Sequence, residues 1–257
     1  MSGFRPPELP DILRAPPRGK VLVLAPHPDD ETMGVGGTLA LHAGQGDPIT
    51  VLCVCNGIQG DPDGWFPREK IVHIRRDEAH AAAQILGIGE LRFLDYPDNL
   101  SDDDMHSVFE GLPADPDEAR QALAAGFAEK LGTIMEEGGF DIVYYPWDQE
   151  LNGDHWLIGQ AVTWLRKHRP DLDVSTSWLG FEVWSACIPG TVIDISDAME
   201  TKLRAIHAYG SQELYVDYAH GAVGLGAYRS LLLERGATYG EAFVGRYRKP
   251  TEGGREE

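Results

Sequence analysis

Short, almost purely apolar runs alternate along this chain with longer segments that have helical periodicity. An unbroken apolar run bounded by Pro or Gly is typical of a strand that is buried on both faces. The first such run, at 20–26, ends at a proline, and the second, at 48–55, is of the same kind. The pattern predicts strands at 20–26, 48–55, 91–96, 141–146, 177–184 and 191–195.

The segments between these runs carry apolar residues at helical spacing, and several of them end on glycine. Such spacing, closed by a glycine, is the usual sign of an amphipathic helix. The longest of them has Asp115 as an N-cap residue and stops at Gly138 and Gly139. The pattern predicts helices at 36–46, 68–88, 115–139, 154–168 and 196–212.

Strand and helix alternate at least as far as residue 170. This order predicts an α/β fold with a mostly parallel sheet flanked by helices on both faces, and a few extra strands follow towards the C-terminus. The chain has 257 residues and neither an internal repeat nor a flexible linker, so we expect a single domain. That domain spans 20–249, between a proline-rich N-terminal arm (1–19) and a polar tail (250–257).

Charge and composition narrow the class of protein. Lys and Arg total 22 against 41 Asp and Glu, which gives a formal net charge of −19. An acidic surface repels a phosphate backbone, so we expect no binding to nucleic acid, and the simplest role of the excess charge is solubility. No apolar stretch approaches the length of a membrane span, and the N-terminal residues do not form a signal peptide.

The chain has three cysteines, and none of them belongs to a C-x2-C pair of the kind that structural zinc sites use. Buried thiols in a reducing compartment are the simplest explanation, which indicates a cytoplasmic protein. Cys53 and Cys55 lie two residues apart on a predicted strand, so we expect both to point to the same face of the sheet.

The candidate chemistry begins where the first strand ends, in the stretch APHPDDE. Ligands of open parallel sheets bind beyond the carboxyl ends of the strands, which is where His27, Asp29 and Asp30 lie. Imidazole and carboxylate are both zinc ligands, so His27 and Asp30 could hold one ion, and Asp29 could take a proton from a water beside it. A third ligand must come from the same edge, and His155 follows the end of the fourth strand.

Other features have simpler explanations. The glycines at 34–37 resemble a phosphate-binding loop, but Leu39 stands where the dinucleotide fingerprint needs its last glycine. This argues against a nicotinamide dehydrogenase, and the glycines more simply let a helix approach the sheet. Aromatic residues such as Trp65 and Tyr218 could stack on sugar rings, although aromatic residues more often belong to the core.

The chain resembles the LmbE/PIG-L family of de-N-acetylases over about residues 20 to 247. The resemblance rests on APHPDDE, RRDEAHAAAQILG, the DH pair after the fourth strand, KLRAIHAYGSQ and YGEAF, in that order. It implies a Rossmann-like α/β fold and a zinc-dependent amidohydrolase. Its substrate would be a small molecule or glycoconjugate that contains N-acetylglucosamine, from which the enzyme removes the acetyl group.

The resemblance also implies roles for single residues. His27, Asp30 and His155 match the zinc ligands, and Asp29 matches the general base. Arg75, in the R-x-x-E pattern with Glu78, matches an arginine that contacts the substrate, although without the resemblance it could equally be a surface ion-pair partner. Asp98, in DYPDNL, falls near a position whose carboxylate contacts sugar hydroxyls.

One position departs from the family pattern. Many relatives have a histidine three residues before the last ligand, and this chain has Asn152 there. An asparagine amide can donate a hydrogen bond to an oxyanion, but it cannot deliver a proton. Asp29 would then act first as base and afterwards as acid, unless another group supplies the proton. We expect Asp154, next to the last ligand, to orient its neighbours.

Several alternatives stay open at the level of sequence. A related metal-dependent amidase could cleave a larger acyl group or a thiol conjugate, and a non-catalytic sugar-binding or nucleotide-binding module could share the fold. The native metal is open as well, because iron and cobalt accept the same ligands as zinc. A homo-oligomer is compatible with the sequence.

Overall fold

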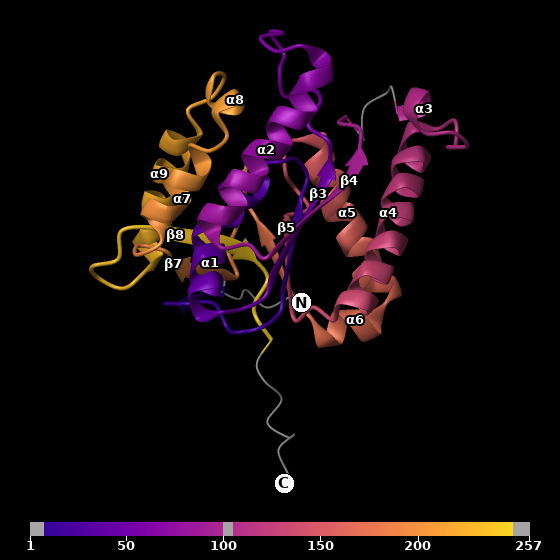
Figure 1. Cartoon of the computed structure of the whole chain (residues 1–257). Coiled ribbons are helices and arrows are strands. Elements are labelled where there is room, and N and C mark those ends of the chain that lie inside the picture. Colours follow the sequence, from indigo (N-terminus) through magenta and orange to yellow (C-terminus); the bar gives the residue numbers. More distant parts are fainter. Residues whose placement is uncertain (1–7, 100–104, 249–257) are drawn as a thin grey trace.

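The computed structural model of the chain describes residues 8–99 and 105–248. Across these residues, eight strands form one sheet with helices on both faces (Figure 1). The polar tail expected at 250–257 and an acidic stretch at 101–104 lie outside the described residues. The strands are β1 (Asp11–Leu13), β2 (Val21–Ala25), β3 (Ile49–Cys55), β4 (Glu90–Tyr96), β5 (Ile142–Pro146), β6 (Ser177–Phe181), β7 (Thr191–Asp194) and β8 (Gly240–Val244).

The order of the strands is β1-β7-β8-β6-β5-β2-β3-β4. All neighbours are parallel except β8, which runs antiparallel to both β6 and β7. The predicted mostly parallel α/β sheet with extra C-terminal strands is therefore confirmed. β2 lies between β3 and β5, so the chain leaves β2 at the point where the strand order reverses, and ligands bind at such points in open sheets.

The helices form two layers. In Figure 1, α1, α2 and α7 lie on one face of the sheet, and α4 and α5 lie on the other. No described helix is both long and apolar enough to cross a membrane. The helices are α1 (Asp30–Gln45), α2 (Arg68–Leu86), α3 (Met105–Val108), α4 (Pro116–Gly138), α5 (Gly153–His168), α6 (Pro170–Ser175), α7 (Met199–Ile206), α8 (Gly210–Glu213) and α9 (Tyr218–Arg229), and a 3-10 turn follows at Ser230–Leu232.

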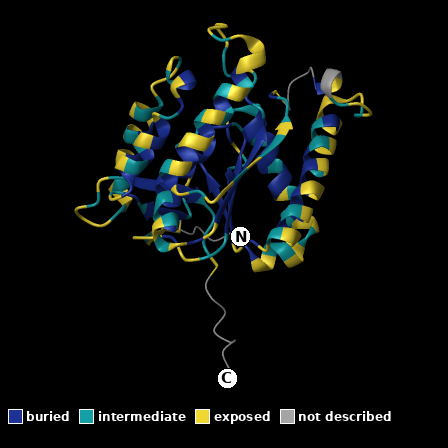
Figure 2. Cartoon of the chain, in the orientation of Figure 1, coloured by how far each residue is buried: buried dark blue, intermediate teal, exposed yellow. Residues whose placement is uncertain are grey.

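The side chains of β2 explain why its sequence is apolar throughout. Val21 and Val23 pack into the core under α1 and α2, whereas Leu22 and Leu24 pack into the core under α4 and α5. A strand whose alternate side chains enter two cores has no polar face. The strands are accordingly buried at the centre of the molecule while the outer helix faces are exposed (Figure 2).

Helix α1 begins at Asp30, six residues before the predicted start, and so it includes the glycine run. The positive end of the helix dipole stabilises negative side chains in the first turn, where Asp30 and Glu31 lie. A Cβ at Gly34 would overlap the ring of Phe181, and one at Gly37 would lie 2.7 Å from Ile195 Cδ1. The glycines therefore let α1 lie close against the sheet and the segment after β7, as the sequence predicted.

Three local expectations were wrong. The predicted arm contains an edge strand, since residues 11–13 pair in parallel with β7. The helix predicted at 196–212 is divided into α7 and α8. Cys53 and Cys55 lie in opposite cores, and β3 and β4 change register between them, since Cys53 pairs with Phe93 and Cys55 pairs with Tyr96. The extra residue of this β-bulge lies in β4, and Val54 and Cys55 at the end of β3 enter the same core, so the alternation of side chains breaks there.

A buried ion pair attaches α7 to the sheet. Lys202 Nζ lies 2.6 Å from Glu241 Oε1 and also donates to the backbone oxygen of Met33 at 2.7 Å. The Glu241 carboxylate accepts from the backbone nitrogens of Gly37 and Thr38, at 2.9 and 2.7 Å. This one carboxylate therefore connects β8, α1 and α7.

We expect Glu241→Ala to lower the free energy of unfolding by about 3–5 kcal/mol, because it leaves the ammonium of Lys202 buried without its partner. Urea unfolding followed by circular dichroism measures this loss. Asp171→Ala is the control, since it removes an exposed partner of Arg169 and should cost less than about 1 kcal/mol. Equal losses in the two variants would contradict the importance of the buried pair.

Candidate metal centre and active site

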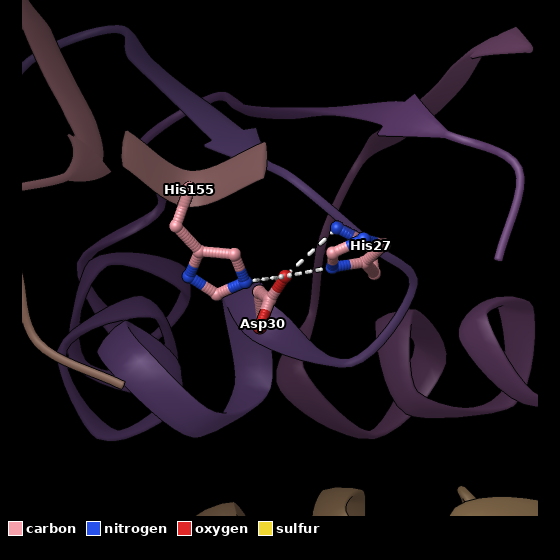
Figure 3. A group of neighbouring side chains, drawn as sticks. All are labelled: His27, Asp30 and His155. Carbon is pink, nitrogen blue, oxygen red and sulfur yellow. Dashed lines mark hydrogen bonds and ion pairs between the residues drawn. The ribbon is translucent and has the colours of Figure 1, made fainter. Parts of the chain in front are cut away.

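The adjacent carboxyl ends of β2 and β5 bring the three predicted ligands together. His27 lies in the turn after β2, Asp30 is the first residue of α1, and His155 lies in the first turn of α5. In Figure 3 the contacts converge on one carboxylate oxygen of Asp30. That oxygen, Oδ2, lies 3.1 Å from His155 Nε2 and 3.2 Å from His27 Nδ1. One ligand atom from each residue lies within 4.8 Å of the others.

His155 indicates that this cluster suits a metal ion. Its side chain is fully buried, and neither ring nitrogen has a hydrogen-bond partner among the described residues. Its Nε2 is near Asp30, and its Nδ1 lies 3.7 Å from Glu150 Oε2, but neither approach has hydrogen-bond geometry. A buried polar atom without a partner is costly, and a bound ion is one way to satisfy it. Two imidazoles and a carboxylate fit zinc or another divalent transition metal.

The electrostatics of the cluster also favour a bound cation. Burial acts to lower the pKa of His27, but the carboxylates of Asp154 and Asp30 outweigh it and raise that pKa to about 10. Burial acts to raise the pKa of Asp30, but the imidazoles of His155 and His27 hold it well below its usual range. The carboxylates therefore create a negative potential that favours a cation at this point.

Asp29, the predicted base, has an unusual backbone conformation. Its φ of 135° lies in a region that glycine normally occupies, and such strain costs about 1–3 kcal/mol and often marks a functional residue. Its Oδ2 accepts a hydrogen bond from Arg75 Nη2 at 3.0 Å. Burial nevertheless raises the pKa of Asp29 to about 8, with Arg75 acting in the opposite direction. The strained turn thus holds a buried carboxylate beside the cluster.

Arg75 contacts the turn that carries Asp29 rather than Glu78 of its own motif. Besides Asp29, its guanidinium donates to the backbone oxygens of Pro28 at 2.7 Å and Gly57 at 3.1 Å. A Cβ at Gly57 would lie 2.6 Å from Arg75 Nη1, so the loop after β3 needs glycine there. Glu78 instead accepts from the backbone nitrogen and the hydroxyl of Ser211, both at 2.7 Å, and so ties α2 to α8.

Asp98 and Asn152 both line a pocket beside the cluster, and the side chain of each also accepts hydrogen bonds from backbone nitrogens. The two oxygens of Asp98 accept from the backbone nitrogens of Gly57 and Gln59, at 2.8 and 2.7 Å. Asn152 is the N-cap of α5, and its Oδ1 accepts from the backbone nitrogens of Asp154 and His155. The group with which Asn152 could hydrogen-bond an oxyanion is therefore its Nδ2.

Asp154 contacts the predicted ligand His27 directly. Its Oδ2 lies 3.0 Å from His27 Nε2 and accepts from the backbone nitrogen of Asn99 at 2.8 Å. A carboxylate on the second nitrogen of a ligating histidine orients the ring and sets its tautomer. This geometry is what the orienting role proposed for Asp154 requires.

Glu31 was missed as part of the site. It is buried and accepts from the hydroxyls of Tyr209 at 2.5 Å and Thr32 at 2.6 Å, and from the backbone nitrogen of Asp29 at 3.2 Å. It therefore links the APHPDDE stretch to KLRAIHAYGSQ, two motifs about 180 residues apart. The acidic residue after the aspartate pair was the available signal, but its partner Tyr209 could not be read from the sequence.

A pocket of about 220 Å³ contains all the predicted site residues except the fully buried His155. Tyr218 is in its wall, while Trp65 is 69% exposed and lies elsewhere. The wall includes further residues that the sequence analysis did not single out, most of them in loops, with one from α1 and one from α8. These are Met33, Gln59, Gly60, Asn99, Val183, Trp184 and Gln212.

Comparison with known proteins places the sequence in a family. The PIG-L family (GlcNAc-PI de-N-acetylase) matches residues 22–165. A probable N-acetyl-alpha-D-glucosaminyl L-malate deacetylase 2 of Bacillus cereus is 30% identical over 215 residues, which cover 79% of this chain and 88% of that protein. A 4-oxalmesaconate hydratase of Pseudomonas putida is 26% identical over 222 residues, covering 79% and 77%.

The fold has a close counterpart among solved structures. The N,N'-diacetylchitobiose deacetylase from Pyrococcus horikoshii superposes with a TM-score of 0.68 at 24% identity, and the match covers 89% of this chain and 84% of that one. This likeness concerns the fold, whereas the family match and the Bacillus relative concern the sequence itself. Together with the ordered motifs, they show that the chain belongs to the PIG-L family of de-N-acetylases.

Proposed function

We propose that this protein is a zinc-dependent hydrolase that removes the acetyl group from a small molecule or glycoconjugate containing N-acetylglucosamine. The observation that carries the proposal is the buried His155, whose ring nitrogens lack hydrogen-bond partners within the described chain and whose Nε2 lies 3.1 Å from Asp30 Oδ2. The buried carboxylate of Asp29 lies beside this cluster. The deacetylase names of relatives, including the Bacillus protein, support the choice of reaction.

Zinc held by His27, Asp30 and His155 would polarise the amide carbonyl and lower the pKa of a water molecule. Arg75 holds Asp29 Oδ2, which leaves Oδ1 to accept the proton of the attacking water. Asn152 Nδ2 donates a hydrogen bond to the carbonyl oxygen as negative charge develops on it. Asp29 then returns its proton to the amine nitrogen as the C–N bond breaks, which yields acetate and the free amine.

The polar wall of the pocket suits the sugar. Arg75 and Asp98 lie on this wall together with Gln59 and Gln212. Sugar hydroxyls both donate and accept hydrogen bonds, so carboxylate, amide and guanidinium groups can satisfy them. We assign substrate binding to Arg75 and Asp98, in addition to the contacts with which they hold the backbone around the pocket.

The test is acetate release from a panel of N-acetylglucosamine compounds, which includes N-acetylglucosaminyl malate and N,N'-diacetylchitobiose. We expect the purified protein to contain about one metal ion per chain, since one set of three ligands forms the site. A chelator should abolish acetate release and zinc should restore it, because the reaction depends on the ion.

Two outcomes would contradict the proposal. Protein that binds no metal would overturn the ligand assignment. If the metal-loaded protein released no acetate, the proposed deacetylation would be wrong. Hydration of 4-oxalmesaconate should then be assayed, because one relative is a hydratase. A non-catalytic sugar-binding module is the weaker alternative, since the three predicted ligands and the predicted base are all present.

A further inference from the structure

A second cavity adjoins the pocket of the metal centre. Its volume is about 230 Å³, and it lies among α1, β8 and α9. It shares Met33, Val183, Trp184 and Tyr218 with the first pocket, so the two spaces have a common wall of four residues. In Figure 1, α9 and β8 lie on the same side of the molecule as α7.

The two spaces differ in the chemistry of their walls. The first pocket presents polar groups such as Arg75, Asp98 and Gln59. The second presents mainly apolar side chains and glycines, among them Ile195, Ala222 and Leu225. At its rim, Trp184 and Val216 are 46% and 40% exposed, so apolar surface extends outward from the cavity.

The ionic groups in the second wall are mostly engaged with one another or with neighbours. Lys202 faces Glu241 at 2.6 Å, and Glu182 Oε1 accepts from Arg229 Nε at 2.8 Å. Asp217 caps α9, where its Oδ1 accepts from the backbone nitrogen of His220 at 2.9 Å. Paired charges attract a ligand weakly, so apolar contact should dominate the binding of a group in this cavity.

We propose that the second cavity, here called the acyl cavity, receives the acyl chain of the substrate, so that the enzyme hydrolyses N-acyl amino sugars with chains longer than acetyl. The inference rests on the proposed amide hydrolysis at the metal centre. An amide has one substituent on nitrogen and another on the carbonyl carbon. The polar wall of the first pocket suits the sugar on nitrogen. The adjacent apolar cavity is then available for the chain on the carbonyl carbon. Water is added across the same C–N bond and yields the longer carboxylate and the same amine.

Gly221 offers a way to fill the acyl cavity. It lines the cavity from α9, and a Cβ at this position would meet no atom within 4 Å. It shares a helix face with Tyr218 and Leu225, three residues before it and four after it, and both of these line the cavity. Gly224 is the matched control, because a Cβ there also meets open space although Gly224 is not among the lining residues. Leucine favours a helix more than glycine does, so both variants should fold.

The experiment measures kcat/KM for acetyl, propanoyl, butanoyl and hexanoyl amides of the amino sugar that is turned over best. In the unmodified protein, we expect the hexanoyl amide to be hydrolysed at least as efficiently as the acetyl amide. Gly221→Leu should lower the ratio of hexanoyl to acetyl kcat/KM by about tenfold or more, the effect of a misfit of one or more methylene groups in an apolar pocket. Gly224→Leu should leave that ratio unchanged.

Failure of this inference differs from failure of the proposed function. An acetyl amide that is hydrolysed best, with efficiency falling at each added carbon, would overturn the acyl cavity and leave the deacetylase assignment intact. The same would follow if Gly221→Leu and Gly224→Leu gave equal ratios. If the zinc-loaded protein hydrolysed no amide in the series, the proposed function would fail, and the acyl cavity with it.

Discussion

Asp29→Asn should lower kcat by about 10²–10⁴-fold, the usual contribution of a positioned general base, while the zinc content stays unchanged. The amide has nearly the shape of the carboxylate and keeps an oxygen for Arg75, but it cannot accept a proton from water. Turnover and metal content of the same preparation measure the two effects. Near-normal turnover in this variant would contradict the assignment of Asp29 as the base.

Asp47→Asn is the control for the loss of a buried carboxylate. Asp47 is also buried, and its Oδ2 lies 2.8 Å from Nδ1 of His42. It lies near the start of β3, at the opposite end of the strands from the site. We expect this variant to be less stable but to keep its kcat, which would show that the effect at Asp29 is chemical.

His155→Ala should remove both zinc binding and activity, because it takes away one of the three proposed ligands. Loss of a residue that only supports a ligand weakens metal binding by about 10–100-fold, so loss of the ligand itself should exceed this range. Metal analysis after dialysis and titration with zinc measure the change. Stoichiometric zinc in this variant would contradict the ligand set.

His42→Ala separates ligation from packing. His42 is as fully buried as His155, and its ring bonds to Asp47 at 2.8 Å and to the Tyr144 hydroxyl at 2.9 Å. Its removal should destabilise the fold through lost packing and hydrogen bonds. The variant should nevertheless bind one zinc ion per chain, because none of these contacts belongs to the metal cluster.

The sequence predicted the ligand cluster because its signals are local. His27, Asp29 and Asp30 directly follow an apolar strand, and His155 follows another. Parallel strands bring such positions to the same edge of a sheet, so the alternation of elements was enough to expect that they meet. The cap at Asp115 was predictable for the same reason, since its side chain bonds only to the next turn of the chain.

The contacts of Arg75 and Asp98 could not be predicted from these signals. The resemblance indicated substrate contacts, whereas the structure adds that Arg75 holds the turn at Asp29 and Asp98 holds the backbone at Gly57 and Gln59. The acceptors and donors of these contacts are mostly backbone groups, which every residue type offers equally. Residue identity therefore carries no signal for them.

By itself, the sequence determined which segments are buried on two faces, that they form a parallel α/β sheet, and which residues gather at its edge. Only the tertiary structure decided that residues 11–13 extend the sheet beside β7, that Cys55 turns into the opposite core, and that α9 and β8 enclose a cavity next to the site. The physical reason is the distance along the chain over which each interaction acts. Periodicity and capping act within a few turns of the chain, whereas strand order, register and cavity shape depend on segments that lie as far as 204 residues apart and meet only when the sheet has formed.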